Sequence, residues 1–214
     1  MKKNFGDIIW TAILAAIGFS LLNDTGRELF VTITTLHPYI IGFIKFMVLA
    51  SMGEMLAVRI TKGKWFLVNG FLLKAVIWGV IGITITFMFK FYSISIISLQ
   101  TQKFLPGLDF PITRAFFTSV FMNLTFGFVF MTAHRISDVT IEYKKTHSHF
   151  APLSKIMAVV NWPYFIIFIF KTIILFWIPA HTLVFMLPEE FRILAAAFLS
   201  IILGLFLSLG KLEK

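Results

Sequence analysis

Residues 37–54 read HPYIIGFIKFMVLASMGE, an apolar run that holds Lys45 in its middle and ends on Glu54. Extended from Pro38 to Val58, the run reaches the roughly 20 residues that a helix needs to cross the ~30 Å hydrocarbon core of a membrane. Only helices and closed barrels satisfy their backbone groups in lipid, and a barrel strand would show alternating polarity over about ten residues. The run is continuous instead, so it predicts a membrane-spanning helix.

Similar runs recur along the chain, in which 58% of the 214 residues are hydrophobic and 14% are charged. We expect membrane segments at about residues 8–22, 38–58, 71–89, 115–133, 156–178 and 193–209. The first segment would be only about 22 Å long as a helix, so it either crosses the membrane or lies along its surface, and we expect it to be retained rather than cleaved as a signal peptide. The predicted fold is a single all-α domain, residues 1–214, forming a multi-pass transmembrane bundle of five to six segments.

The distribution of cations predicts the orientation. If all six segments cross, eleven of the nineteen Lys and Arg residues fall on one side, five fall on the other and three lie within segments. The positive-inside rule then places both termini in the cytoplasm or an organelle matrix. We expect the protein in a bacterial inner membrane or an organelle inner membrane. The net charge of +9 is assigned to anionic lipid headgroups on that side, and not to nucleic acid, because the cations lie at helix ends.

The two charges of the opening run need separate explanations, because a spacing of nine residues places them on opposite helix faces. Lys45 lies about 10 Å along the axis from Pro38, so we expect its side chain to extend to the headgroups, the alternative being that it faces the bundle interior. The Glu54 side chain is too short to reach the headgroups, and a charge at membrane depth costs about 2.5 to 3.5 kcal/mol. We expect Glu54 to be buried or to face a cavity, with a partner such as Lys74 on the next segment.

Other polar side chains also lie at membrane depth or just beyond it. With the two already named, they give the candidate set Glu54, Lys74, Asn123, Asn161, Lys171 and His181. Facing one another, these groups would form either a polar internal path or a buried clasp, and the sequence leaves both open. Pro163 falls inside the segment at 156–178, where we expect it to bend the helix. Between segments, residues 93–114 are expected to form a loop and 140–152 an exposed loop or short helix.

Residue spacings add a further pattern. His37-Pro38 is followed after fourteen residues by Gly53-Glu54, and similar landmarks recur downstream. In chain order the landmarks are Pro38, Gly53, Gly79, Gly82, Met122-Asn123, Gly127-Phe128, Trp177, Pro179, Pro188, Arg192 and Phe206-Leu207-Ser208. They resemble the Mpv-seventeen and twenty-two-kilodalton peroxisomal membrane protein family over roughly residues 37–208. The chain departs from that pattern with Glu54 in place of an aspartate, Ile83 in place of a proline and a shortened interval between Pro179 and Pro188.

This resemblance implies an integral protein of an inner or organelle membrane that acts as a small-solute or ion pore. Glu54, Lys74, Asn123 and Lys171 are then candidates for the lining of the path, and their mixed signs argue against strong charge selectivity. Arg192 would anchor the last helix by pairing with Glu189 or a lipid phosphate, or would simply lie at the interface.

The sequence contains no recognisable motif for enzyme catalysis. The chain has no cysteine, and its glycines form none of the nucleotide-binding or hydrolase patterns. The histidines near Lys144-Lys145 lack metal-ligand spacing and neighbouring carboxylates. We therefore expect no catalytic residues, no metal and no cofactor. The function predicted is a small-solute or ion channel; the alternatives are a structural or lipid- and protein-interacting membrane protein and a secondary transporter. Assembly as a homo-oligomer is left open.

Overall fold

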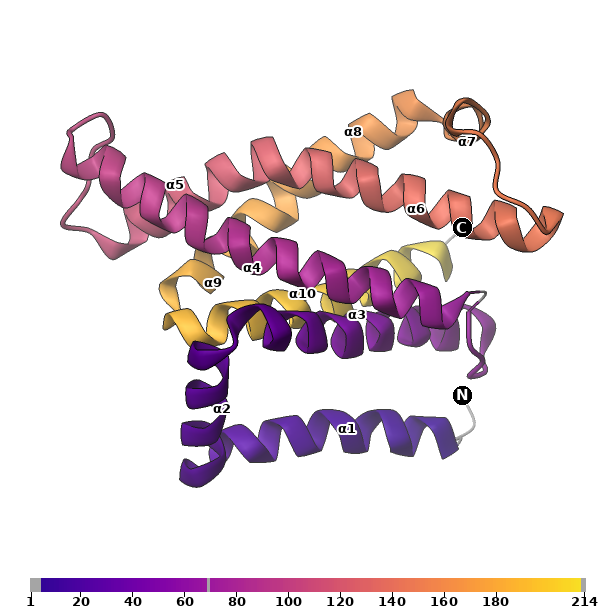
Figure 1. Ribbon diagram of the computed structural model, residues 1–214, viewed down its shortest axis with the longest axis horizontal. Coiled ribbons are helices and arrows are strands. Elements are labelled where there is room, and N and C mark those ends of the chain that lie inside the picture. The colour runs from indigo at the N-terminus through magenta and orange to yellow at the C-terminus, as the bar shows by residue number, and fades with distance from the viewer. Residues whose placement is uncertain (1–4, 69, 213–214) are drawn as a thin grey trace. The chain divides into compact units, whose positions relative to one another are not determined.

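The structure, a computed structural model, describes residues 5–68 and 70–212, with side chains up to residue 205. Within these ranges the chain is helical and contains no strand, which confirms the predicted all-α class (Figure 1). Five helical runs there are long and apolar enough to cross a membrane: α1 (Phe5–Leu22), α3 (Pro38–Lys62), α4 (Phe71–Thr101), Pro111–His147 and Trp162–Met186. The protein is therefore a multi-pass membrane protein.

The sixth predicted segment, residues 193–209, belongs to helix α10 (Glu189–Leu212). The side chains of its last part, including those of Phe206, Leu207 and Ser208, lie outside the described residues. Its membrane crossing therefore stays a prediction, as does the resemblance at its end.

Contacts divide the chain into two compact units. Unit 1 comprises Met1–Thr86 and Ile193–Lys214, and unit 2 comprises Phe87–Arg192. The expectation of a single domain is not tested by this division and stays a prediction.

Three successive helices form the first part of unit 1. α1 and α3 run in opposite directions, and α2 (Asp24–Leu36) lies crosswise between the end of one and the start of the other (Figure 1). Asn23 caps α2 by accepting hydrogen bonds from the backbone N–H groups of Thr25 and Gly26, and Pro38 opens α3 at a position where no N–H is needed. α2 is absent from the predicted segments because it is short and too polar to be recognised as a membrane segment.

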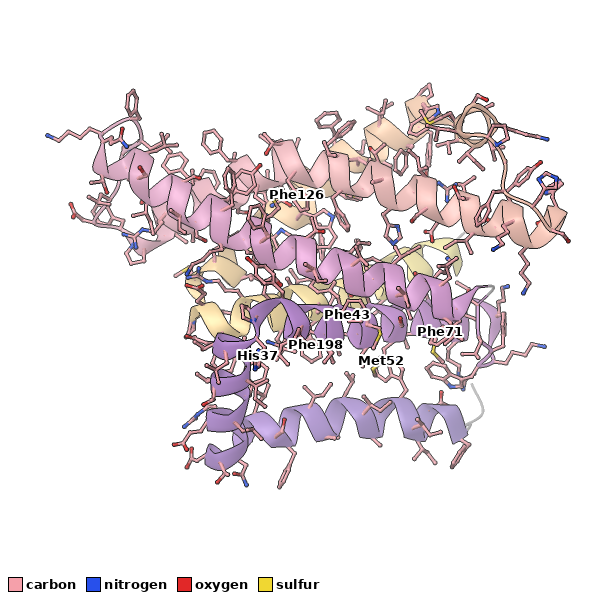
Figure 2. The ribbon with its side chains drawn as sticks, viewed as in Figure 1. His37, Phe43, Met52, Phe71, Phe126 and Phe198 are labelled. Atoms are coloured by element: carbon pink, nitrogen blue, oxygen red, sulfur yellow. The ribbon has the colours of Figure 1, made fainter. Side chains whose placement is uncertain are left out.

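Glycines allow the helices of unit 1 to approach closely. A Cβ on Gly82 of α4 would fall within 3.0 Å of the Gly42 carbonyl oxygen on α3, and one on Gly53 would lie 3.2 Å from the Cα of Ile201 on α10. Small residues at helix crossings bring backbones together, which is a main source of packing energy in membranes. Phe43 of α3, labelled in Figure 2, covers Gly79. The landmark glycines Gly53, Gly79 and Gly82 therefore lie where α3 contacts its neighbours.

Unit 2 contains two long interrupted helices. In the first, α5 (Pro111–Met122), the π-helical turn η1 (Asn123–Gly127) and α6 (Phe128–His147) form one run. The predicted segment at 115–133 lies inside this run. The polar stretch at 140–152 was expected to be a loop or short helix, but α6 continues through it as far as His147. Buried Val139 and Ile141 attach that end of α6 to the unit, which local polarity does not reveal.

The second interrupted helix of unit 2 corrects the predicted segment at 156–178. The short α7 (Leu153–Val159) is followed by a break, and the membrane run consists of α8 (Trp162–Thr172), the π-helical turn η2 (Ile173–Trp177) and α9 (Ile178–Met186). Pro163 lies in the first turn of α8, so it begins a helix and does not bend one, because a first-turn proline leaves no hydrogen bond unmade. Pro179 is the internal proline and is the second residue of α9.

Candidate functional site

Glu54 lies on α3 and contacts two side chains of α4. Its carboxylate accepts a hydrogen bond from the indole Nε1 of Trp78 at 2.7 Å and lies 3.7 Å from the Nζ of Lys74. The Lys74 and Glu54 side chains are 20% and 22% exposed. Lys74 is thus the interhelical partner that the sequence suggested, while Trp78 was missed. That the pair lines a path stays a prediction.

A second ion pair in unit 1 was not predicted. The Arg59 guanidinium at the end of α3 donates to both carboxylate oxygens of Asp7 on α1, each at 2.8 Å, and the Trp65 indole donates to the same carboxylate at 2.7 Å. Arg59 also donates to the Gly63 carbonyl oxygen. Such a two-pronged arrangement is specific to arginine and holds both groups in fixed positions. A carboxylate and an arginine at the ends of two apolar runs were the only signal in the sequence.

Lys45 corrects an expectation. Its side chain is buried, its Nζ donates to the Thr34 hydroxyl at 3.0 Å and lies 4.1 Å from the centre of the Phe30 ring. Both partners belong to α2, the helix that the sequence did not predict. Lys45 therefore does not extend to the headgroups as expected, because α2 covers it with a hydroxyl and an aromatic face.

Asn123 and His181 meet in unit 2. The Asn123 Oδ1 lies 3.1 Å from the His181 Nδ1, and the Asn123 amide donates to the Ser119 carbonyl at 2.8 Å. The Ser119 hydroxyl in turn donates to the carbonyl oxygen of Ile178 at 2.8 Å. Since the Asn123 nitrogen is engaged as a donor, its oxygen accepts and His181 carries its proton on Nδ1. These buried groups connect α5 and η1 with the start of α9.

Aromatic rings enclose His181. The Trp177 ring stacks on the imidazole with centroids 5.1 Å apart, and Phe89 packs edge-on at 5.6 Å. Phe185 lies 4.7 Å from Phe89 and 6.5 Å from His181. The Trp177 Nε1 is buried and makes no hydrogen bond. Asn123 opens η1 and Trp177 closes η2, and such π-helical turns are common at functional sites.

Asn161 and Lys171 do not join the other candidates. Asn161 is exposed and caps α8 by accepting a hydrogen bond from the Tyr164 N–H at 3.3 Å, and Lys171 is exposed near the end of the same helix. Both were chosen only for lying within a predicted apolar segment. The membrane run begins at Trp162, later than predicted, so Asn161 lies just before its first residue.

The remaining landmarks lie at helix boundaries. Pro188 precedes α10, and its carbonyl accepts from the Phe191 N–H at 3.1 Å. Pairing of Arg192 with Glu189 was one of the alternatives, beside a lipid phosphate or simple placement at the interface, but Glu189 pairs with Lys90 at 2.6 Å. Arg192 instead donates to the Leu187 carbonyl at 2.9 Å and lies over the Phe185 ring. Burial lowers the pKa of its guanidinium, and the nearby Glu189 and Glu190 carboxylates oppose this shift.

A pocket of about 270 Å³ opens beside Arg192, entirely within unit 2. Lys90, Arg114 and Arg192 contribute three cations to its wall, and Glu189 contributes one carboxylate. From the sequence, Lys90 and Arg114 counted only as loop charges and Arg192 as a helix anchor or interface residue. Nothing in the sequence joined the three, because they lie up to 102 residues apart along the chain.

Comparison of the chain with family models, with curated proteins and with solved structures gave no match. The resemblance found in the residue spacings therefore stays a prediction. What is established is a multi-pass helical membrane protein whose described units each contain a group of buried or half-buried polar side chains.

Proposed function

We propose that the protein conducts a small solute or an ion across the membrane, and that Glu54 and Lys74 form part of the path. The observation that carries this proposal is the looseness of their contact. Charge-assisted hydrogen bonds measure about 2.7–2.9 Å, whereas Glu54 and Lys74 are 3.7 Å apart and each is about a fifth exposed. An ion pair at this distance makes no strong charge-assisted hydrogen bond, unlike the two-pronged contact between Arg59 and Asp7.

The cost of the two charges supports the same proposal. Both lie in helices that are long and apolar enough to cross a membrane, where ionisable groups are expensive and usually mark solute or ion pathways. The resemblance to the Mpv-seventeen and twenty-two-kilodalton peroxisomal membrane protein family adds the same expectation. Opposite charges side by side favour weak selectivity between anions and cations.

Recording from the purified protein in planar bilayers tests the proposal. We expect discrete currents in the wild type, a shift toward anions in Glu54→Gln and a shift toward cations in Lys74→Met. Lys64→Gln is the matched control, because Lys64 is exposed and lies beyond the end of α3. Wild-type protein with a cooperative melting transition that remains silent across voltages, and that releases no entrapped solutes from liposomes, would contradict conduction.

A structural role is the second candidate, and a different observation favours it. The side chains of Ser119, Asn123 and His181 form a hydrogen-bonded chain in the interior of unit 2. A closed clasp of this kind joins helices without offering a path to solutes. Under this alternative His181→Phe would lower the melting temperature, and neither unit would conduct. Liposome flux without resolvable single-channel currents would instead indicate a slow carrier.

A further inference from the structure

We propose that the pocket formed by Lys90, Arg114 and Arg192 binds an anion of the phosphate class, carried either on a lipid headgroup or on a small solute. This proposal concerns binding alone and does not depend on conduction. Its starting point is charge: three cations line the pocket and Glu189 is the one carboxylate among the lining residues. A concentration of positive charge in a concave site favours an anion.

The guanidinium groups of Arg114 and Arg192 have N–H donors that a ligand with hydrogen-bond acceptors could use. Arg114 donates through Nη2 to the Leu108 carbonyl at 3.0 Å, but its Nε is buried and makes no hydrogen bond. Arg192 donates through Nε to the Leu187 carbonyl. Its Nη1 lies 3.5 Å from the Ser93 hydroxyl, which is a long and weak hydrogen bond. Guanidinium groups recognise phosphate oxygens with several N–H donors at once. The two arginines thus retain donor capacity that a phosphate would use.

The helix ends add to this field. Pro111, in the first turn of α5, and Glu189, the first residue of α10, both line the pocket. Helix N-termini carry partial positive charge and unsatisfied N–H groups, which stabilise anions. Glu189 is already neutralised by Lys90 at 2.6 Å in an exposed pair, which an incoming anion can displace because exposed ion pairs are weak.

The size of the pocket limits the ligand. A volume of about 270 Å³ is below the usual range of roughly 300–1,000 Å³ for drug-sized molecules. A phosphate group with little attached to it fits this space. Phe185 and Thr118 also line the pocket, so a short apolar or hydroxylated extension of the ligand would have a surface to contact.

Binding measurements in dodecyl maltoside, which carries no phosphate, test the proposal. Inorganic phosphate is titrated by calorimetry, and short-chain phosphatidylglycerol is followed as adducts by native mass spectrometry. We expect the wild type to bind at least one of the two probes and Arg114→Gln/Arg192→Gln to bind it about tenfold more weakly or not at all. Lys103→Gln is the control, because Lys103 is an exposed cation in the loop before α5 that does not line the pocket.

Each outcome has a defined meaning. Phosphate binding lost in the double variant indicates a free solute, and lipid adducts lost without phosphate binding indicate a headgroup. Since the double variant also removes contacts to backbone carbonyls, its melting temperature is compared with that of the wild type. If it does not fold, Lys90→Gln replaces it, because Lys90 is exposed and we expect a several-fold loss from this change alone. Failure of the wild type to bind either probe, or equal binding by all variants, would overturn the proposal.

Discussion

At the scale of single residues, the contact around Asp7 separates a structural ion pair from a candidate functional one. Arg59 and Trp65 supply three hydrogen bonds to its carboxylate, all between 2.7 and 2.8 Å. Glu54 has one hydrogen bond of this length, from Trp78, and a longer contact with Lys74. Geometry of the partners, and not the presence of charge, therefore distinguishes the two carboxylates.

Trp65→Phe is predicted to destabilise unit 1. The change removes the indole N–H that donates to Asp7 at 2.7 Å but keeps an aromatic ring against Gly6. We expect a loss of about 1 kcal/mol in the free energy of unfolding, since Asp7 is partly exposed and a single hydrogen bond within a protein contributes about this amount. Unfolding in mixed detergent micelles measures it. In an Asp7→Asn background the cost should shrink, and an unchanged cost would contradict the assignment.

At the scale of helices, the crossing of α3 and α4 depends on glycine. The Thr86 hydroxyl donates to the Gly82 carbonyl at 2.7 Å on the side that faces Gly42, so the two backbones and this hydroxyl fill the contact. Gly79 differs, because the atoms nearest to it belong to the Phe43 ring and not to the backbone of α3. A side chain can move away, whereas a helix backbone can move only as a whole.

Gly82→Ala is accordingly predicted to cost about 1–3 kcal/mol in unfolding free energy, the range for overpacking a close contact. Gly79→Ala should cost less. Gly18→Ala on α1, where an added Cβ would meet no atom within 4 Å, should be neutral or stabilising by up to about 1 kcal/mol. The three variants form one series for thermal or detergent unfolding. Equal costs at positions 79 and 82 would show that α4 shifts as a body.

At the scale of the whole molecule, the orientation in the membrane is the main prediction. The chain has no cysteine, so single cysteines can be introduced at Lys3, Asp24, Gln102 and His149 and labelled with an impermeant maleimide. We expect positions 3 and 149 to react from the cytoplasmic or matrix side and positions 24 and 102 from the opposite side, in accord with the positive-inside rule. Reaction of 102 and 149 from one side would contradict the arrangement.

The same experiment decides how α1 lies. Asp7 near its start contacts Arg59 near the end of α3, and α1 has the length and apolar character to cross. We therefore expect α1 to span beside α3, with position 3 on the side of position 149. Labelling of position 3 together with position 24 would instead place α1 along the membrane surface.

The sequence by itself determined the class of the protein and most of its apolar helices, because hydropathy is summed over neighbouring residues and needs no tertiary information. It also indicated the pairing of Glu54 with Lys74, since Glu54 lies near the end of one predicted segment and Lys74 near the start of the next. Tertiary structure alone decided that α2 covers Lys45, that Pro163 begins a helix, that Asn161 and Lys171 are exposed, and that Lys90, Arg114 and Arg192 share a pocket. These features depend on how helices rotate and which faces meet, and side chains far apart in sequence provide the partners that fix those choices.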